Sequence, residues 1–164
     1  METVKEVIEI DTPGGPMASI VFRPADGKEY PGIVVIEEIF GVNDHIQDVA
    51  RRFAEQGYVA AAPDLFHRAG RLLTVPYSDM PGTAKLREGL TEDDLVGDLN
   101  ALISHLQSAS SLSRREVGIT GYCYGGRVSY LAACRVEDIG AAAVYYGGGI
   151  VPRADQPTPA VPLI

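Results

Sequence analysis

The chain has 164 residues, of which 46% are hydrophobic and 22% charged, and its formal net charge is −8. This length suits one domain with a substantial core, so we expect residues 1–164 to form a single domain. The acidic charge argues against a nucleic-acid partner. No run approaches the ~20 apolar residues of a membrane span, and the charged N-terminus lacks the apolar core of a signal peptide. These two features predict a cytoplasmic protein.

Strand-like and helix-like segments alternate along the chain. The first two strands are separated by a Thr-Pro-Gly-Gly turn, which predicts an antiparallel hairpin. Several later strands are continuous apolar runs, typical of strands buried on both faces of a parallel sheet. In chain order we expect strands at 4–10, 17–23 and 32–36, a helix from 43 or 44 to 56, a strand at 58–62, a helix from 93 or 94 to 107, a strand at 117–120, a helix at 126–134, and strands at 141–145 and 161–164.

This order predicts an α/β fold, with a mostly parallel sheet flanked by helices and preceded by an antiparallel hairpin. One long segment, residues 66–92, contains Gly70, Pro76, Pro81 and Gly82, and we expect it to be irregular. A loop of this length in a compact domain is usually a lid or a substrate-binding loop.

Gly121-Tyr122-Cys123-Tyr124-Gly125 lies between an expected strand and an expected helix. This is the context of a nucleophile elbow, G-x-S-x-G, with cysteine in place of serine. The glycines allow a sharp turn, and a helix N-terminus favours thiolate over thiol. The pentapeptide therefore predicts a cysteine hydrolase on an α/β-hydrolase scaffold. The alternative is a glycine-rich turn around a small structural cysteine.

The second cysteine, Cys134, follows Cys123 by eleven residues. If both lie on one helix they are ~16 Å apart, whereas a disulfide needs Cα atoms within about 7 Å. We therefore expect two free thiols, which fits a reducing compartment, and interpret Cys134 as core filling.

An acyl-transfer cysteine enzyme needs a base, an orienting acid and an oxyanion hole. In α/β-hydrolases the acid and the histidine follow the nucleophile, but no histidine follows Cys123. His45 and His105 fit solvated surface positions. His67 follows a strand at the edge where ligands gather, so a substrate contact is a further hypothesis. The usual triad cannot be assembled from these residues.

Glu37 and Glu38 follow the apolar run at 32–36, at the same expected edge of the sheet. Their alternative interpretation is a solvated pair in a loop. The backbone N–H groups after this strand supply half of the oxyanion hole in α/β-hydrolases. The other half is the N–H of the residue after the nucleophile, here Tyr124.

Four separate blocks resemble the dienelactone hydrolase family, in the family's order and across nearly the whole chain. The resemblance implies a hydrolase of dienelactone or related esters and lactones, acting on a small molecule through a cysteine acyl-enzyme intermediate. We expect no cofactor and no metal. The blocks are Glu38-Ile39-Phe40-Gly41-Val42-Asn43, Pro63-Asp64-Leu65-Phe66, Gly121-Tyr122-Cys123-Tyr124-Gly125-Gly126 and Tyr145-Tyr146-Gly147.

The resemblance also implies roles for particular residues. By position, Cys123 is the nucleophile, and Glu38 is the carboxylate that contacts the resting thiol and helps to generate thiolate. The N–H groups of Ile39 and Tyr124 would donate hydrogen bonds to the oxyanion.

Family members that act on dienelactone hold its carboxylate with an arginine. Arg68 or Arg87 could do so here, and an exposed surface position is the alternative for either.

The sequence departs from the family at its C-terminal end. The family's triad Asp follows the strand that begins here at Val161, and its His comes later still, so this sequence stops before both. We therefore expect a missing C-terminal segment to complete the site and to cover an otherwise unpaired apolar edge.

Two other functional hypotheses stay open at this point. The chain could be a non-catalytic α/β fragment or interaction module that retains the elbow without the triad. It could also be a different cysteine-elbow protein, amidotransferase-like or DJ-1-like, although amidotransferases need a downstream His-x-Glu that this sequence lacks. Acylation and turnover measurements separate these hypotheses.

Overall fold

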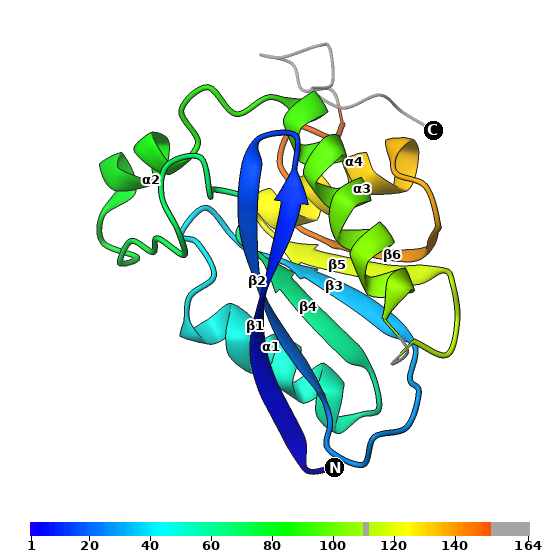
Figure 1. Ribbon diagram of the computed structural model, residues 1–164. Coiled ribbons are helices and arrows are strands. Elements are labelled where there is room, and N and C mark those ends of the chain that lie inside the picture. The colour runs from blue at the N-terminus through cyan, green and yellow to red at the C-terminus, as the bar shows by residue number, and fades with distance from the viewer. Residues whose placement is uncertain (110–111, 152–164) are drawn as a thin grey trace.

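The computed structural model describes residues 1–109 and 112–151 (Figure 1). Within these residues, six strands form one sheet in the order β1-β2-β4-β3-β5-β6. The strand expected at 161–164 lies outside the described residues. The elements are β1 (Thr3–Thr12), β2 (Gly15–Pro24), β3 (Gly32–Ile36), α1 (Asp44–Glu55), β4 (Val59–Pro63), α2 (Met80–Leu86), α3 (Glu92–Ser108), β5 (Val117–Tyr122), α4 (Tyr124–Arg135) and β6 (Ile139–Tyr145).

The sheet combines an antiparallel hairpin with a parallel part, as the sequence predicts. β1 and β2 pair antiparallel from Thr3 opposite Pro24 to Thr12 opposite Gly15. β2 also pairs antiparallel with β4, whereas β4, β3, β5 and β6 are parallel to one another. The carboxyl ends of these four parallel strands therefore meet at one edge of the sheet, where α/β proteins place their sites.

Helices cover both faces of the sheet. α1 packs on one face against β2, β3 and β4, and α3 and α4 pack together on the other (Figure 1). In β3, Ile33 and Val35 belong to the core beneath α1, and Val34 and Ile36 belong to the core beneath α3 and α4. Because successive side chains of a strand point to opposite faces, a strand between two helical layers is apolar at every position. None of the described helices is both long enough and apolar enough to cross a bilayer.

The segment expected to be irregular at 66–92 contains the short helix α2, which corrects that prediction. The Asp79 carboxylate accepts a hydrogen bond from the Gly82 N–H (3.0 Å) and so caps the helix. Pro81 lies in the first helical turn, where its missing N–H costs no helical hydrogen bond. The proline and glycine that favoured a loop therefore lie at positions that a short helix tolerates.

Candidate active site

Cys123 lies at the tight turn between β5 and α4. Its φ of 55° and ψ of −116° are unusual for a residue other than glycine. Two backbone hydrogen bonds hold this conformation, because the Cys123 N–H donates to the Tyr145 carbonyl (3.1 Å) and the Arg127 N–H donates to the Cys123 carbonyl (3.2 Å). The predicted strand–turn–helix context is present, with a strained residue at its apex.

Glycines allow neighbouring backbone segments to meet at this turn. A Cβ on Gly125 would lie 2.5 Å from the Glu37 carbonyl oxygen and 2.6 Å from that of Ile36. A Cβ on Gly121 would lie 2.3 Å from the Gly125 carbonyl oxygen. At such short distances to backbone oxygens, neither position can carry a side chain. Gly125 thereby brings the elbow against the end of β3, which Glu37 and Glu38 follow.

Glu38 is half-buried in the turn that follows β3. The Tyr77 hydroxyl donates a hydrogen bond to Glu38 Oε2 (3.4 Å), and the Asn43 amide donates to that hydroxyl (3.3 Å). Tyr77 comes from the segment between β4 and α2, and sequence reasoning did not identify it. The only signal for it was the expectation that this segment contributes to a substrate-binding loop.

Tyr146 follows β6 and lies near the elbow, with its ring centroid 6.2 Å from that of Tyr122. Partial desolvation raises the pKa of the Tyr146 hydroxyl, and the charges of Glu38 and Cys123 raise it further, followed by those of Tyr122 and Tyr77. Tyr146 also has a positive φ of 40° and is 68% exposed, so its side chain stands at the surface.

The two expected oxyanion donors come from adjacent segments. Ile39 lies in the turn after β3, and Tyr124 is the first residue of α4. The first N–H groups of a helix have no acceptor within the helix, so the Tyr124 N–H points out of the helix end beside Cys123. Their donation to an oxyanion stays a prediction.

The Tyr124 side chain packs between the elbow and Arg87. Its ring centroid lies 5.6 Å from that of Phe66 and 5.6 Å from the Arg87 guanidinium carbon. Burial raises the pKa of Tyr124 to about 12, although the charges of Arg127 and Arg87 oppose that shift. Of the two candidate arginines, Arg87 is therefore the one beside the nucleophile turn.

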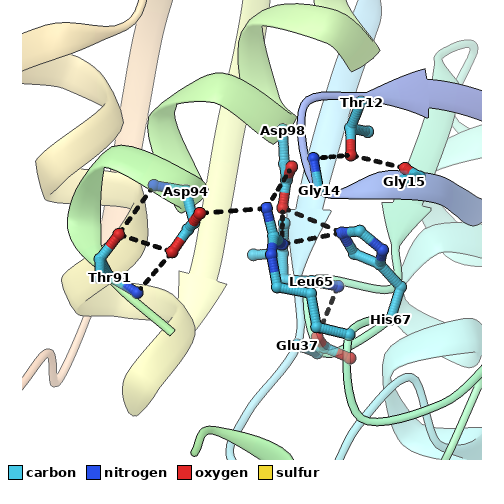
Figure 2. A network of polar contacts seen from close by, with 10 residues as sticks. Thr12, Gly14, Gly15, Glu37, Leu65, His67, Thr91, Asp94 and Asp98 are labelled. Carbon is cyan, nitrogen blue, oxygen red and sulfur yellow. Dashed lines mark hydrogen bonds and ion pairs between the residues drawn. The ribbon is translucent and has the colours of Figure 1, made fainter. Parts of the chain in front are cut away.

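Arg68 is paired instead with two carboxylates of α3, Asp94 and Asp98. Figure 2 shows these carboxylates with His67 beside them. The Arg68 guanidinium donates to both carboxylate oxygens of the fully buried Asp98 (2.6 and 3.1 Å) and to Asp94 (3.3 Å). His67, which was a hypothetical substrate contact, lies 3.1 Å from Asp98 and 2.8 Å from Arg68. His45 is exposed, as expected.

Glu37 is fully buried, so the interpretation of Glu37 and Glu38 as a solvated pair is wrong for Glu37. Its Oε1 accepts a hydrogen bond from the Leu65 N–H (2.9 Å; Figure 2). Burial raises the pKa of this carboxyl well above its usual value, and the nearby Asp64 carboxylate raises it further. Glu37 thus connects the ends of β3 and β4 beneath the site.

Comparison with known proteins decides the family. The sequence model of the dienelactone hydrolase family matches residues 17–163. The chain belongs to this family. Each of the four resembling blocks lies within the matched residues, including those that carry Glu38 and Cys123.

Individual relatives agree with this assignment. A protein of Synechocystis sp., provisionally named carboxymethylenebutenolidase, is 36% identical over 136 residues, which are 82% of this chain and 55% of that protein. The crystal structure of a provisionally named dienelactone hydrolase from Klebsiella pneumoniae has a TM-score of 0.81 at 29% identity, covering 96% of this chain and 65% of the other. The chain spans about half the length of the curated relatives that it matches.

More distant structures confirm the fold class. An α/β hydrolase from Penicillium sp. is 16% identical, has a TM-score of 0.67 and covers 85% of this chain. The mostly parallel sheet with flanking helices and an N-terminal hairpin is therefore an α/β-hydrolase-type fold, as the sequence predicts.

Proposed function

We propose that this chain carries the nucleophile and the oxyanion donors of a hydrolase that opens lactones or esters through an acyl-cysteine intermediate. The observation that carries the proposal is the strained Cys123 at the N-terminus of α4, on an elbow that Gly125 brings against the end of β3, which Glu37 and Glu38 follow. Membership of the dienelactone hydrolase family and relatives named for a butenolide-cleaving activity support a lactone or ester substrate.

In the proposed reaction, Glu38 takes the thiol proton and the Cys123 thiolate attacks the substrate carbonyl carbon. The N–H groups of Ile39 and Tyr124 donate to the oxygen that becomes negative. Collapse breaks the bond to the ring or ester oxygen, which leaves with the proton held by Glu38. Water then cleaves the thioester and releases a carboxylic acid and the free thiol.

Cleavage of the thioester requires a base that activates water. We place this base outside the described histidines, because Nε2 of His67 is engaged by both Asp98 and Arg68, and His45 and His105 are exposed on α1 and α3. We propose that a C-terminal segment of a longer protein completes the site with an Asp and a His. The 164-residue chain alone should then acylate readily and deacylate slowly.

The proposed substrate class is supported by the family and by an arginine beside the elbow. The proposed partner is a small lactone or ester, with neither nucleic acid nor membrane involved. Arg87 lies beside Tyr124 and would hold a substrate carboxylate, whereas the guanidinium of Arg68 is paired with Asp98. The Cys123 thiol, which forms no disulfide among the described residues, supports a reducing, cytoplasmic location.

The experiment is a burst measurement with an activated nitrophenyl ester. We expect about one equivalent of nitrophenolate per chain in a rapid phase, followed by slow turnover. Cys123→Ala should abolish the burst, and Cys134→Ala should retain it. An equal burst from the Cys123→Ala variant would show that the nucleophile is wrongly assigned.

A further inference from the structure

We propose that the buried carboxyl groups of Glu37 and Asp64 share one proton and form a pH-sensitive clasp between the ends of β3 and β4. The proton lies on Glu37 Oε2 and is donated to Asp64 Oδ1. This inference goes beyond the proposed function, because the clasp exists whether or not Cys123 is the nucleophile.

The two carboxyl groups occupy equivalent positions on neighbouring parallel strands. Glu37 is the first residue after β3, and Asp64 is the first residue after β4. In the parallel register of these strands, Val34 lies opposite Ala61. Three residues further along each strand, the same register places Glu37 opposite Asp64. The Leu65 N–H, which directly follows Asp64, donates to Glu37 Oε1 (2.9 Å; Figure 2), as expected for side chains that lie side by side.

Each carboxyl group has one oxygen with a hydrogen-bond partner and one without. Glu37 and Asp64 are both 0% exposed. Glu37 Oε1 accepts from the Leu65 N–H, and Asp64 Oδ2 accepts from the Leu72 N–H. Glu37 Oε2 and Asp64 Oδ1 have no hydrogen-bond partner among the residues that the structure describes. Buried polar atoms rarely lack a partner, and one proton held between these two oxygens satisfies both.

The surrounding charges place the proton on Glu37. Burial raises the pKa of Asp64, and the Leu72 N–H opposes that shift. Positive charge on His67 and Arg71 also favours the ionised form of Asp64. Burial raises the pKa of Glu37 well above its usual value, and the negative charge of Asp64 raises it further. Glu37 is therefore the acid of the pair and Asp64 the carboxylate.

The clasp holds a turn that borders the elbow. A Cβ on Gly125 would lie 2.5 Å from the Glu37 carbonyl oxygen, so the backbone of Glu37 packs against the start of α4. Tyr124 of α4 also senses the charge of Glu37, but burial raises the pKa of its hydroxyl to about 12 and keeps it neutral. Once the shared proton is lost at alkaline pH, two buried carboxylates repel each other and loosen the ends of both strands.

Infrared spectroscopy of the chain in D2O tests the shared proton, because the C=O stretch of a protonated carboxyl is distinct from the bands of carboxylates. Exposed carboxyls are ionised at neutral pH, so a protonated band there reports the pair. We expect the parent chain to show this band and Glu37→Gln to lack it, since the new amide can donate to Asp64 instead. Asp98→Asn is the matched control, because Asp98 is equally buried but paired with Arg68, and it should keep the band.

Asp64→Asn separates a shared proton from simple burial of Glu37. Without the negative charge of Asp64, the band should disappear at a pH lower by about one unit or more than in the parent. An unchanged midpoint in Asp64→Asn would overturn the proposal, because burial alone would then hold the proton. Absence of the band from the parent at neutral pH, or its persistence in Glu37→Gln, would overturn it as well.

Hydrogen exchange of the Leu65 N–H, followed by NMR, tests the clasp itself. After correction for base-catalysed exchange, we expect its rate in the parent to rise about tenfold as the pair loses its proton. Glu37→Gln should show no such rise, and an equal rise in both chains would contradict the clasp. None of these measurements involves Cys123, so their failure leaves the proposed function untouched.

Discussion

Glu37 and Glu38 are neighbours in the chain but occupy opposite environments. Glu38 is half-buried beside Tyr77, whereas Glu37 is fully buried and accepts a hydrogen bond from the Leu65 N–H. The second oxygen of Glu37 has no hydrogen-bond partner among the described residues. Burial is the first cause of its raised pKa, so this carboxyl keeps its proton to higher pH than an exposed glutamate does.

A raised pKa makes the contribution of Glu37 to stability depend on pH. The contribution is fully present below the unfolded pKa of about 4.3 and is lost as the pH rises through the folded pKa. Glu37→Gln removes this titration and keeps an oxygen for the Leu65 N–H. We expect the variant to exceed the parent in free energy of unfolding by about 1 kcal/mol at pH 8, and the difference to vanish near pH 4, in urea titrations at both pH values.

Glu88→Gln is the control for this prediction, because Glu88 is exposed. It should change the free energy of unfolding by less than about 0.5 kcal/mol at both pH values. A Glu37→Gln variant that is no more stable than the parent at pH 8 would contradict the assignment of Glu37 as a carboxyl that resists ionisation.

At the residue scale, the sequence predicted those features that depend on residues close by in the chain. Cys123 was predicted because its neighbours within two positions, Gly121 and Gly125, define the elbow. Burial of Glu37 and the contact between Tyr77 and Glu38 depend on segments that are distant in sequence. The resemblance to a family therefore supplied Glu38, but only the structure supplied Tyr77.

At the scale of elements, a network of charges fastens the segment after β4 to α3 (Figure 2). The Asp98 carboxylate is fully buried on α3, and Arg68 satisfies both of its oxygens. His67 lies against the same carboxylate. Removal of the arginine would leave the buried Asp98 carboxylate without its guanidinium partner, which is the costly way to break an ion pair.

Arg68→Met tests this network. We expect the free energy of unfolding to fall by about 2 kcal/mol, below the 3–5 kcal/mol of a fully buried pair because the Arg68 side chain is 24% exposed. Arg71→Met is the matched control, since the Arg71–Glu9 pair is solvent-exposed, and it should cost less than about 1 kcal/mol. Equal losses in urea unfolding of the two variants would contradict a stabilising role for the Asp98 network.

Helices and strands with a regular apolar period were predicted well, whereas the short helix α2 and a long-range ion pair were not. α1 begins after the cap at Asn43, as the sequence indicated, and β3 matches its predicted range. α2 was missed because Pro81 and Gly82 resemble loop residues when the cap at Asp79 is overlooked. The pairing of Arg68 with Asp98 joins residues thirty positions apart, which no local pattern reports.

At the scale of the whole molecule, the described sheet ends in β6, which pairs with β5 and leaves most of its residues exposed. The sequence order of strands and helices was sufficient to predict an antiparallel hairpin followed by a mostly parallel sheet, because alternating strands and helices favour parallel pairing. The order of the strands within the sheet came from the structure. Activity could not be predicted in the same way. The chain spans about half the length of its curated relatives, and no histidine follows Cys123.

The most direct test of the account is the intact mass of the chain after brief exposure to an activated ester, with peptide mapping of the product. We predict a single added acyl group on the peptide that contains Cys123, persisting because we place the base for rapid deacylation on the proposed C-terminal segment. Cys134→Ala should give the same adduct. Acylation that persists in Cys123→Ala, or that maps to another residue in the parent chain, would contradict the assignment of Cys123 as the nucleophile.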